Sequence, residues 1–141
     1  MKRFLLVFAL LLSSIQLFAN YCGNLGITIE NTTAHDCVLR YTRMDYGYMQ
    51  DQVPTTIPAG STSPTFYMHQ GFFGLAVLLD YRCDNKTLIF YSSQDYCRYS
   101  AGMVSGEQIY ENGSELHMDH KIQLGSYWSK LPGQITWRIR R

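Results

Sequence analysis

Residues 71–91 of the chain read GFFGLAVLLDYRCDNKTLIFY. Residues 71–83 are nearly all apolar, and their number suits a central strand that is buried on both faces. Asp84, Asn85 and Lys86 then supply turn chemistry. Residues 87–91 are β-branched and aromatic enough to pair back as the next strand. This segment therefore predicts a β-hairpin at the centre of a sheet.

The sequence on both sides of this hairpin also has the pattern of strands. Residues 25–30 and 135–140 alternate apolar with polar side chains, and residues 37–42 and 65–69 are rich in β-formers. Asn112-Gly113 is a hairpin signal, after which alternate residues from 116 to 124 share one apolar face. Residues 43–54 and 58–61 have the composition of a loop and a turn.

The fold class follows from this series of short strands. About eight of them, spaced by roughly 8–12 residues, are typical of a β-sandwich or a β-barrel. An antiparallel barrel of this size would need more even strand lengths. We therefore predict an all-β protein with a single antiparallel β-sandwich of about eight strands, held by disulfides.

The first nineteen residues have the pattern of a secretory signal. Lys2 and Arg3 precede an apolar run, residues 4–12, and Ala19 is a small residue at the expected cleavage site. The run is shorter than the roughly 20 residues that span a bilayer. We expect residues 1–19 to be a signal peptide, residues 20–141 to be one domain, and the product to be secreted or periplasmic rather than membrane-spanning.

The charge balance bears on possible partners. The chain has 12 Lys and Arg against 11 Asp and Glu, and loss of Lys2 and Arg3 leaves 10 against 11. Nucleic-acid-binding proteins usually carry a clear basic excess. We therefore expect no nucleic-acid partner.

The four cysteines are Cys22, Cys37, Cys83 and Cys97. An even number in a small exported domain predicts two disulfides, whereas zinc sites normally show closely spaced cysteine pairs. Three connectivities are open. The sequential one, Cys22 with Cys37 and Cys83 with Cys97, closes short loops worth about 3 kcal/mol each. A hairpin that turned at Thr32-Thr33 would instead set Cys37 opposite Thr28. We take the sequential pairing as the expectation.

Three segments carry a resemblance to a known group of proteins. Residues 27–31 read ITIEN before a turn, residues 57–61 read IPAGS, and residues 71–74 read GFFG before a long strand. The first half of the mature chain thereby resembles small secreted β-sandwich proteins of the aegerolysin and actinoporin kind. That resemblance implies binding of membrane lipid head groups. Actinoporins carry an amphipathic helix ahead of the sandwich, whereas here only residues 20–24 precede the first strand, which argues against pore formation of that type.

Tyrosine-rich segments are the candidate ligand-binding residues. The chain has 11 Tyr, and Tyr41, Tyr46 and Tyr48 occur together with Met49. Tyr in a loop offers a flat apolar face and a hydrogen-bonding tip, which suit head groups, sugar rings or a protein surface. Tyr is also a favoured strand residue, so core or edge packing is the alternative role. We predict that this loop contacts the ligand.

A metal site is the rival hypothesis. His117 and Asp119 lie two apart on a predicted strand and so share a face, and His69 is a possible third ligand for zinc or copper. A polar outer face explains the same residues. The chain has no Gly-x-Ser-x-Gly and no His-Glu-x-x-His motif.

The function predicted from the sequence is that of a secreted, non-catalytic binding module without a cofactor. Its expected partners are a membrane lipid head group, a glycan or a host protein. The alternative is a small metal-binding or metal-dependent hydrolytic secreted enzyme.

Overall fold

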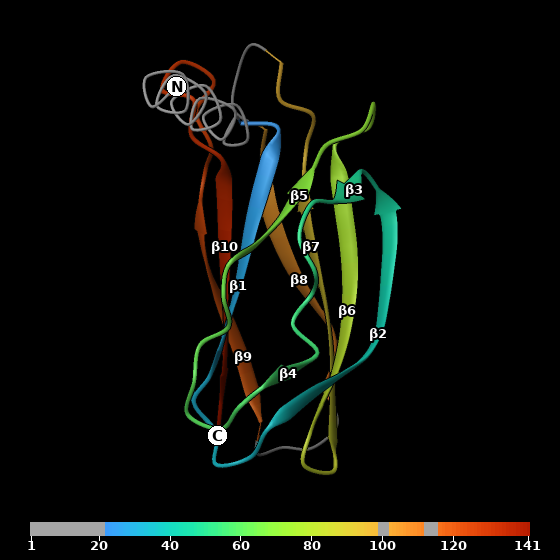
Figure 1. The fold of residues 1–141 in the computed structure, drawn as a ribbon, viewed down its shortest axis with the longest axis vertical. Helices are drawn as coiled ribbons and strands as arrows, with labels where there is room; N and C mark the ends of the chain where they lie inside the picture. The colour runs from blue at the N-terminus through green and yellow to red at the C-terminus, as the bar shows by residue number, and fades with distance from the viewer. Residues whose placement is uncertain (1–21, 99–101, 112–115) are drawn as a thin grey trace, which may run out of the picture.

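The computed structural model describes residues 22–98, 102–111 and 116–141. In these residues ten strands form two five-stranded sheets that pack as a sandwich (Figure 1). The strands are β1 (Asn24–Asn31), β2 (Cys37–Tyr46), β3 (Tyr48–Met49), β4 (Thr56–Ile57), β5 (Phe66–His69), β6 (Leu75–Cys83), β7 (Lys86–Gln94), β8 (Val104–Glu111), β9 (His117–Gln123) and β10 (Gly133–Arg140). The predicted sandwich is confirmed. The excess over eight strands comes from β3 and β4, which have two residues each.

The two sheets differ in how their strands pair. The first sheet has the order β3-β5-β1-β10-β9, and the second has the order β4-β2-β6-β7-β8. The named pairings are antiparallel except that of β1 with β10, which is parallel. The sandwich is therefore antiparallel, as predicted, apart from this one parallel pairing. β6 is the middle strand of the second sheet and pairs with β7, as the central hairpin predicted.

The core lies between the inner faces of the sheets and follows the predicted alternation in β10, whereas on the predicted apolar face of residues 116–124 Ile122 and Leu124 are 42% and 47% exposed. In β10, Ile135, Trp137 and Ile139 are buried, while the residues between them face outward. Trp137 packs against Phe90 of β7, with ring centroids 4.8 Å apart. Gly106 of β8 makes room for this indole, because a Cβ on Gly106 would lie 2.8 Å from a ring atom of Trp137.

Several predicted boundaries change in the structure. Residues 43–46, expected in a loop, extend β2, and Tyr48–Met49 is a strand of the first sheet. Residues 71–74, expected in the central strand, precede β6. β1 and β2 lie in different sheets, so residues 32–33 do not close a hairpin. The predicted signal peptide, residues 1–19, and the Asn112-Gly113 turn lie outside the described residues.

Both disulfides form, but with nested rather than sequential connectivity. Cys22 is bonded to Cys97 and Cys37 to Cys83, with Cα–Cα distances of 5.8 and 4.1 Å. Cys37 and Cys83 lie directly opposite each other in the β2–β6 ladder. The sequential pairing was therefore wrong, because it assumed contacts between neighbours in sequence. Two disulfides are typical of an oxidising compartment such as the periplasm or the exterior.

Peptide mapping tests this connectivity directly. Digestion of the unreduced protein should release one linked pair containing Cys22 and Cys97 and another containing Cys37 and Cys83. Titration of the same sample should find no free thiol, since the structure leaves no cysteine unpaired. A linked peptide containing Cys22 and Cys37 would contradict the nested pairing.

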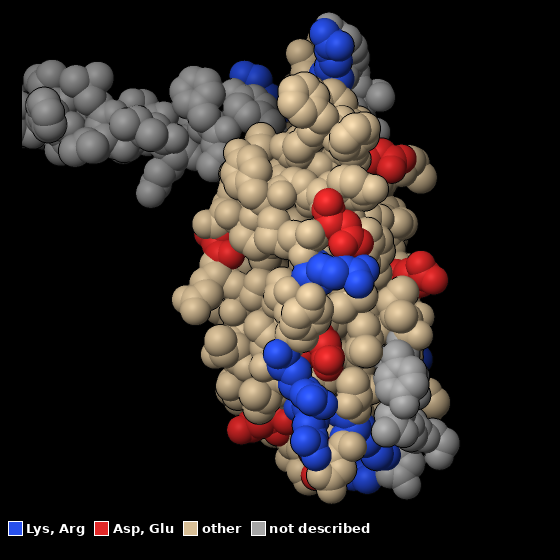
Figure 2. Space-filling view, turned by 90° about the vertical axis from the view of Figure 1, so that its right-hand side faces the viewer, with Lys and Arg blue, Asp and Glu red and all other residues tan. Residues whose placement is uncertain are grey.

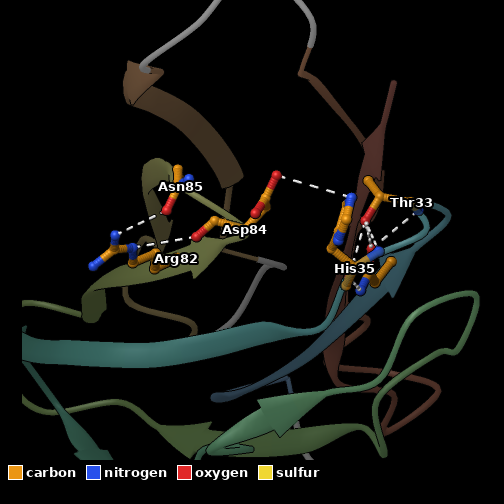
Figure 3. A network of polar contacts seen from close by, with 6 residues as sticks. Thr33, His35, Arg82, Asp84 and Asn85 are labelled. Atoms are coloured by element: carbon orange, nitrogen blue, oxygen red, sulfur yellow. Dashed lines mark hydrogen bonds and ion pairs between the residues drawn. The ribbon is translucent and has the colours of Figure 1, made fainter.

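One end of the sandwich, where the C-terminus lies, carries a network of polar contacts (Figure 3). The Arg82 guanidinium donates to the carbonyl of Asp84 and to Oδ1 of Asn85. The Asp84 carboxylate lies 3.9 Å from Nε2 of His35. The hydroxyl of Thr33 donates to the carbonyl of His35. We call this the lower end.

The described residues contain no helix with the length and apolar composition required to cross a bilayer.

Candidate functional site

The opposite end, which we call the upper end, has a different surface. It is formed by the connections β2–β3, β5–β6, β7–β8 and β9–β10. Ten of the fourteen exposed large hydrophobic side chains among the described residues lie here: Tyr46, Tyr48, Phe72, Phe73, Tyr96, Met103, Leu124, Tyr127, Trp128 and Leu131. Exposed apolar surface gathered in one place marks an interaction site.

Uncharged side chains also dominate this end in the space-filling view. Figure 2 shows them covering much of the upper part of one face, where basic atoms lie near the tip and an acidic group lies below them, while more acidic and basic side chains lie in its middle and lower parts. The upper connections contain three charged residues within the described ranges, namely Asp95, Arg98 and Lys130. The two ends of the sandwich therefore present different chemistry.

The β2–β3 connection is a single glycine between two exposed tyrosines. Gly47 has φ 75°, and a Cβ there would lie 2.5 Å from the carbonyl oxygen of His69. A side chain would clash in this backbone conformation, so glycine is required. Here the chain passes from the second sheet to the first. The side chains of Tyr46 and Tyr48 remain 50% and 53% exposed.

The β5–β6 connection projects two phenylalanines from a tight turn. The amides and carbonyls of Gly71 and Gly74 bond reciprocally at 2.8 and 3.3 Å. Gly74 has φ 89°, which a residue with a side chain rarely adopts. Phe72 and Phe73 between these glycines are 95% and 80% exposed. A short, hydrogen-bonded turn thus holds two large apolar side chains away from the core.

Ring contacts join these two connections. The rings of Tyr46 and Phe73 have centroids 5.9 Å apart, and those of Tyr48 and His69 are 5.2 Å apart. His69 also forms a hydrogen bond through Nδ1 with the side-chain oxygen of Asn24. We call Tyr46, Tyr48, Phe72, Phe73 and the nearby Tyr96 the aromatic cluster.

A hollow lies beside the aromatic cluster. It has a volume of about 260 Å³ and is lined by His69, Gln70, Gly71, Phe72 and Tyr96. Gln70 links the hollow to the β7–β8 connection. Its side-chain oxygen accepts from the backbone N–H of Cys97 at 2.7 Å, and its side-chain nitrogen donates to the carbonyl of Cys97 at 2.8 Å. The Cys22–Cys97 disulfide holds the same segment. The hollow is therefore built from fixed elements.

Polar side chains lie just below the cluster on the second sheet. The Arg43 guanidinium donates to the Asp45 carboxylate at 2.9 Å, and this hydrogen bond lowers the pKa of Asp45. The Tyr91 hydroxyl donates to the same carboxylate at 3.1 Å. Burial, followed by that hydrogen bond, raises the pKa of Tyr91. These groups satisfy one another's hydrogen-bonding capacity and lie next to the aromatic cluster.

Two of the four predicted ligand-binding residues are thus brought together, and two are not. Tyr46 and Tyr48 belong to the aromatic cluster. Tyr41 is exposed but lies in the middle of β2, opposite Asp80 of β6. Met49 is partly buried and packs against the core.

The three predicted metal ligands are not brought together. His69 is on β5, whereas His117 and Asp119 are on β9, at the far edge of the first sheet. The Asp119 carboxylate forms an ion pair with Arg140 at 3.1 Å. Within the described ranges, no group of three or more His, Cys, Asp or Glu residues could hold a metal ion. The geometry gives the metal-enzyme alternative no support.

Sequence reasoning missed Phe72, Phe73, Tyr96 and Trp128. Apolar periodicity assigned the two phenylalanines to a buried strand, since a short apolar run does not reveal which of its residues face the core. The glycines on both sides of Phe72-Phe73 were the available signal of a turn.

Comparison with known proteins by sequence finds no matching family model and no matching curated protein. Comparison of structures finds similar folds. The lipid-binding protein Nakanori has a TM-score of 0.63 at 11% identity, covering 84% of this chain and 71% of its own. The RahU protein, solved in complex with a Tris molecule, has a TM-score of 0.61 at 11% identity, covering 86% and 96%.

A third similar structure is IP-1A from Alcaligenes faecalis, with a TM-score of 0.56 at 13% identity, covering 85% of this chain and 91% of its own. These likenesses establish a shared β-sandwich fold. At such low identity they do not place the chain in a family.

Proposed function

We propose that this protein is an exported, non-catalytic lipid-binding module whose aromatic cluster contacts the head-group region of a membrane. The observation that carries the proposal is the exposure of Phe72 and Phe73, 95% and 80%, on a turn closed by hydrogen bonds. Because the turn is fixed, these side chains are presented to a ligand rather than folded onto the core.

The physical chemistry of the cluster suits a lipid interface. Removing apolar surface from water yields about 25 cal/mol per Å². Tyr46 and Tyr48 add rings with hydrogen-bonding tips, a type of residue that is enriched where apolar and polar layers of a bilayer meet. That Nakanori, a lipid-binding protein, has a similar fold supports the proposal.

Export is part of the proposal. Residues 1–19 would act as a signal peptide cleaved near Ala19, leaving residues 20–141 as one secreted or periplasmic domain. The two disulfides are in keeping with either destination.

Co-sedimentation with vesicles tests the binding function. Phe72→Ala combined with Phe73→Ala should weaken binding about 30-fold, if each aromatic anchor contributes about 1 kcal/mol. The lipids are phosphatidylcholine vesicles and, separately, vesicles with an equal share of phosphatidylglycerol.

The matched control is Val38→Ala combined with Tyr41→Ala. Both residues are exposed, at 47% and 55%, but lie on β2 away from the upper end. This variant should bind like the wild type. Failure of the wild-type protein to sediment with either vesicle would contradict lipid binding and direct attention to a glycan or protein ligand.

A further inference from the structure

The β9–β10 connection is a second structured projection at the upper end. The amide of Ser126 donates to the carbonyl of Leu131 at 2.8 Å, and the amide of Leu131 donates back at 2.9 Å. The amide of Ser129 donates to Oγ of Ser126 at 3.1 Å, and Lys130 takes a φ of 53°. These bonds fix residues 126–131 as a tight turn.

The turn exposes several large apolar side chains. Trp128 is 84% exposed and meets Tyr127 edge-on, with centroids 5.3 Å apart. Leu124 and Leu131 beside them are each 47% exposed. A tryptophan is normally well buried in a folded domain, so its display on a hydrogen-bonded turn points to a contact made outside the chain.

The width of the first sheet separates this turn from Tyr48 of the aromatic cluster, which lies on the opposite edge strand, β3. β9 and β3 are the two edges of the first sheet, four strand spacings apart. At about 4.8 Å per spacing, that distance is about 19 Å. Figure 1 shows the β9–β10 connection and the turn that precedes β6 on opposite sides of the upper end. The hollow itself is nearer to the turn, because β5, which ends at His69, lies two strand spacings from β10 and three from β9, or about 10–14 Å.

We propose that residues 124–131 form a second anchor, and that the ligand of the upper end is the surface of a bilayer, engaged by both anchors at once. The inference rests on the proposed lipid-binding function and deepens it, because it adds a second membrane contact to the one made by the aromatic cluster. Two anchors on one rigid domain bind with a high effective concentration for the second contact, so each strengthens the other.

The residue types favour the interfacial layer of a bilayer with uncharged or zwitterionic lipids. Trp and Tyr concentrate at the level of the head groups. The three charged residues in the described upper connections, Asp95, Arg98 and Lys130, make no basic cluster of the kind that selects anionic lipids. Binding is accordingly expected to depend little on salt.

Tryptophan fluorescence tests this second anchor, because the chain has two tryptophans in opposite environments. Trp128 is 84% exposed and Trp137 is 1% exposed. With phosphatidylcholine vesicles, the wild-type emission should shift to the blue, and brominated phosphatidylcholine should quench the part that shifts. In Trp128→Phe, Trp137 remains in the core, and both the shift and the quenching should be lost while the protein still sediments.

The affinity for vesicles and the fluorescence response to monomeric lipid provide two further independent measurements. Trp128→Ala should weaken vesicle binding about fivefold or more, as expected for an aromatic anchor. A short-chain phosphatidylcholine kept below its micelle concentration should leave the Trp128 emission unchanged, because a single lipid does not extend over both anchors. The control variant Val38→Ala combined with Tyr41→Ala should keep the full spectral response.

The outcomes separate this inference from the proposed function. If no vesicle binds the wild type, both are wrong. If the wild type binds but Trp128 is neither shifted nor quenched, or if Trp128→Ala binds unchanged, the second anchor is wrong and lipid binding stands. Binding that requires phosphatidylglycerol, or a full Trp128 response to monomeric lipid, likewise overturns the inference alone.

Discussion

Replacing Trp137 by alanine is expected to lower the free energy of unfolding by about 3–5 kcal/mol, as for other buried aromatic residues. The indole is 1% exposed and packs against Phe90 and His120, with centroids 4.8 and 4.7 Å away. Its Nε1 donates to Oγ of Ser92 at 2.9 Å, and Ser92 is itself fully buried. The substitution would therefore leave a cavity and an unsatisfied hydroxyl.

Urea unfolding followed by circular dichroism measures this loss. Trp128→Ala is the matched control, since it removes the same side chain from the surface and should change stability by no more than about 0.5 kcal/mol. Similar losses for the two variants would mean that the interior packing described here is wrong. Trp137→Phe, which keeps an aromatic ring, should lose an amount of stability between those of the two alanine variants.

Removing the Cys37–Cys83 disulfide is expected to cost about 4 kcal/mol in the chain-entropy model. The bond joins residues 46 apart, and its loss through Cys37→Ala with Cys83→Ala frees a long loop in the unfolded chain. Both residues are also in the core, at 0% and 1% exposure, so alanine leaves small voids there. The loss of stability therefore has two sources, the greater entropy of the unfolded chain and the poorer packing of the folded core.

The second disulfide provides the comparison. While Cys37–Cys83 is intact, breaking Cys22–Cys97 frees only the two outer segments of 15 and 14 residues, and the expected cost is about 3–4 kcal/mol. Loss of both bonds would remove much of the roughly 5–15 kcal/mol by which domains are stable. Unfolding of each variant without reductant measures the costs. A cost below about 1 kcal/mol for the Cys37–Cys83 pair would contradict this account.

The strands were predictable wherever side chains alternate between core and solvent. Ile135, Trp137 and Ile139 face the core as their spacing predicted, because successive residues of a strand point to opposite sides. The same rule failed for Phe72 and Phe73. Their neighbours are apolar as well, so no alternation marked where the strand begins.

The candidate site was predicted in part. Tyr46 and Tyr48 stood out because they flank Gly47 in a segment read as a loop, and the structure leaves both half-exposed. Tyr41 and Met49 were grouped with them by proximity in sequence. In the structure Tyr41 lies in the middle of β2 and Met49 packs against the core, so both are apart from Tyr46 and Tyr48. Tyr96 and Trp128 carried no local signal that distinguishes a contact residue from a core residue.

The sequence by itself determined the all-β class, the alternation of buried residues, and that four cysteines would form two disulfides. These properties depend on composition and on the local geometry of a strand. The tertiary structure decided that β1 and β10 run parallel, that Cys37 pairs with Cys83, and that aromatic turns gather at one end. Tyr46 and Phe73 meet because β2 and β6 are antiparallel partners with Tyr46 opposite Ala76. Such a contact depends on long-range register, which residues distant in sequence establish jointly and which no single segment encodes.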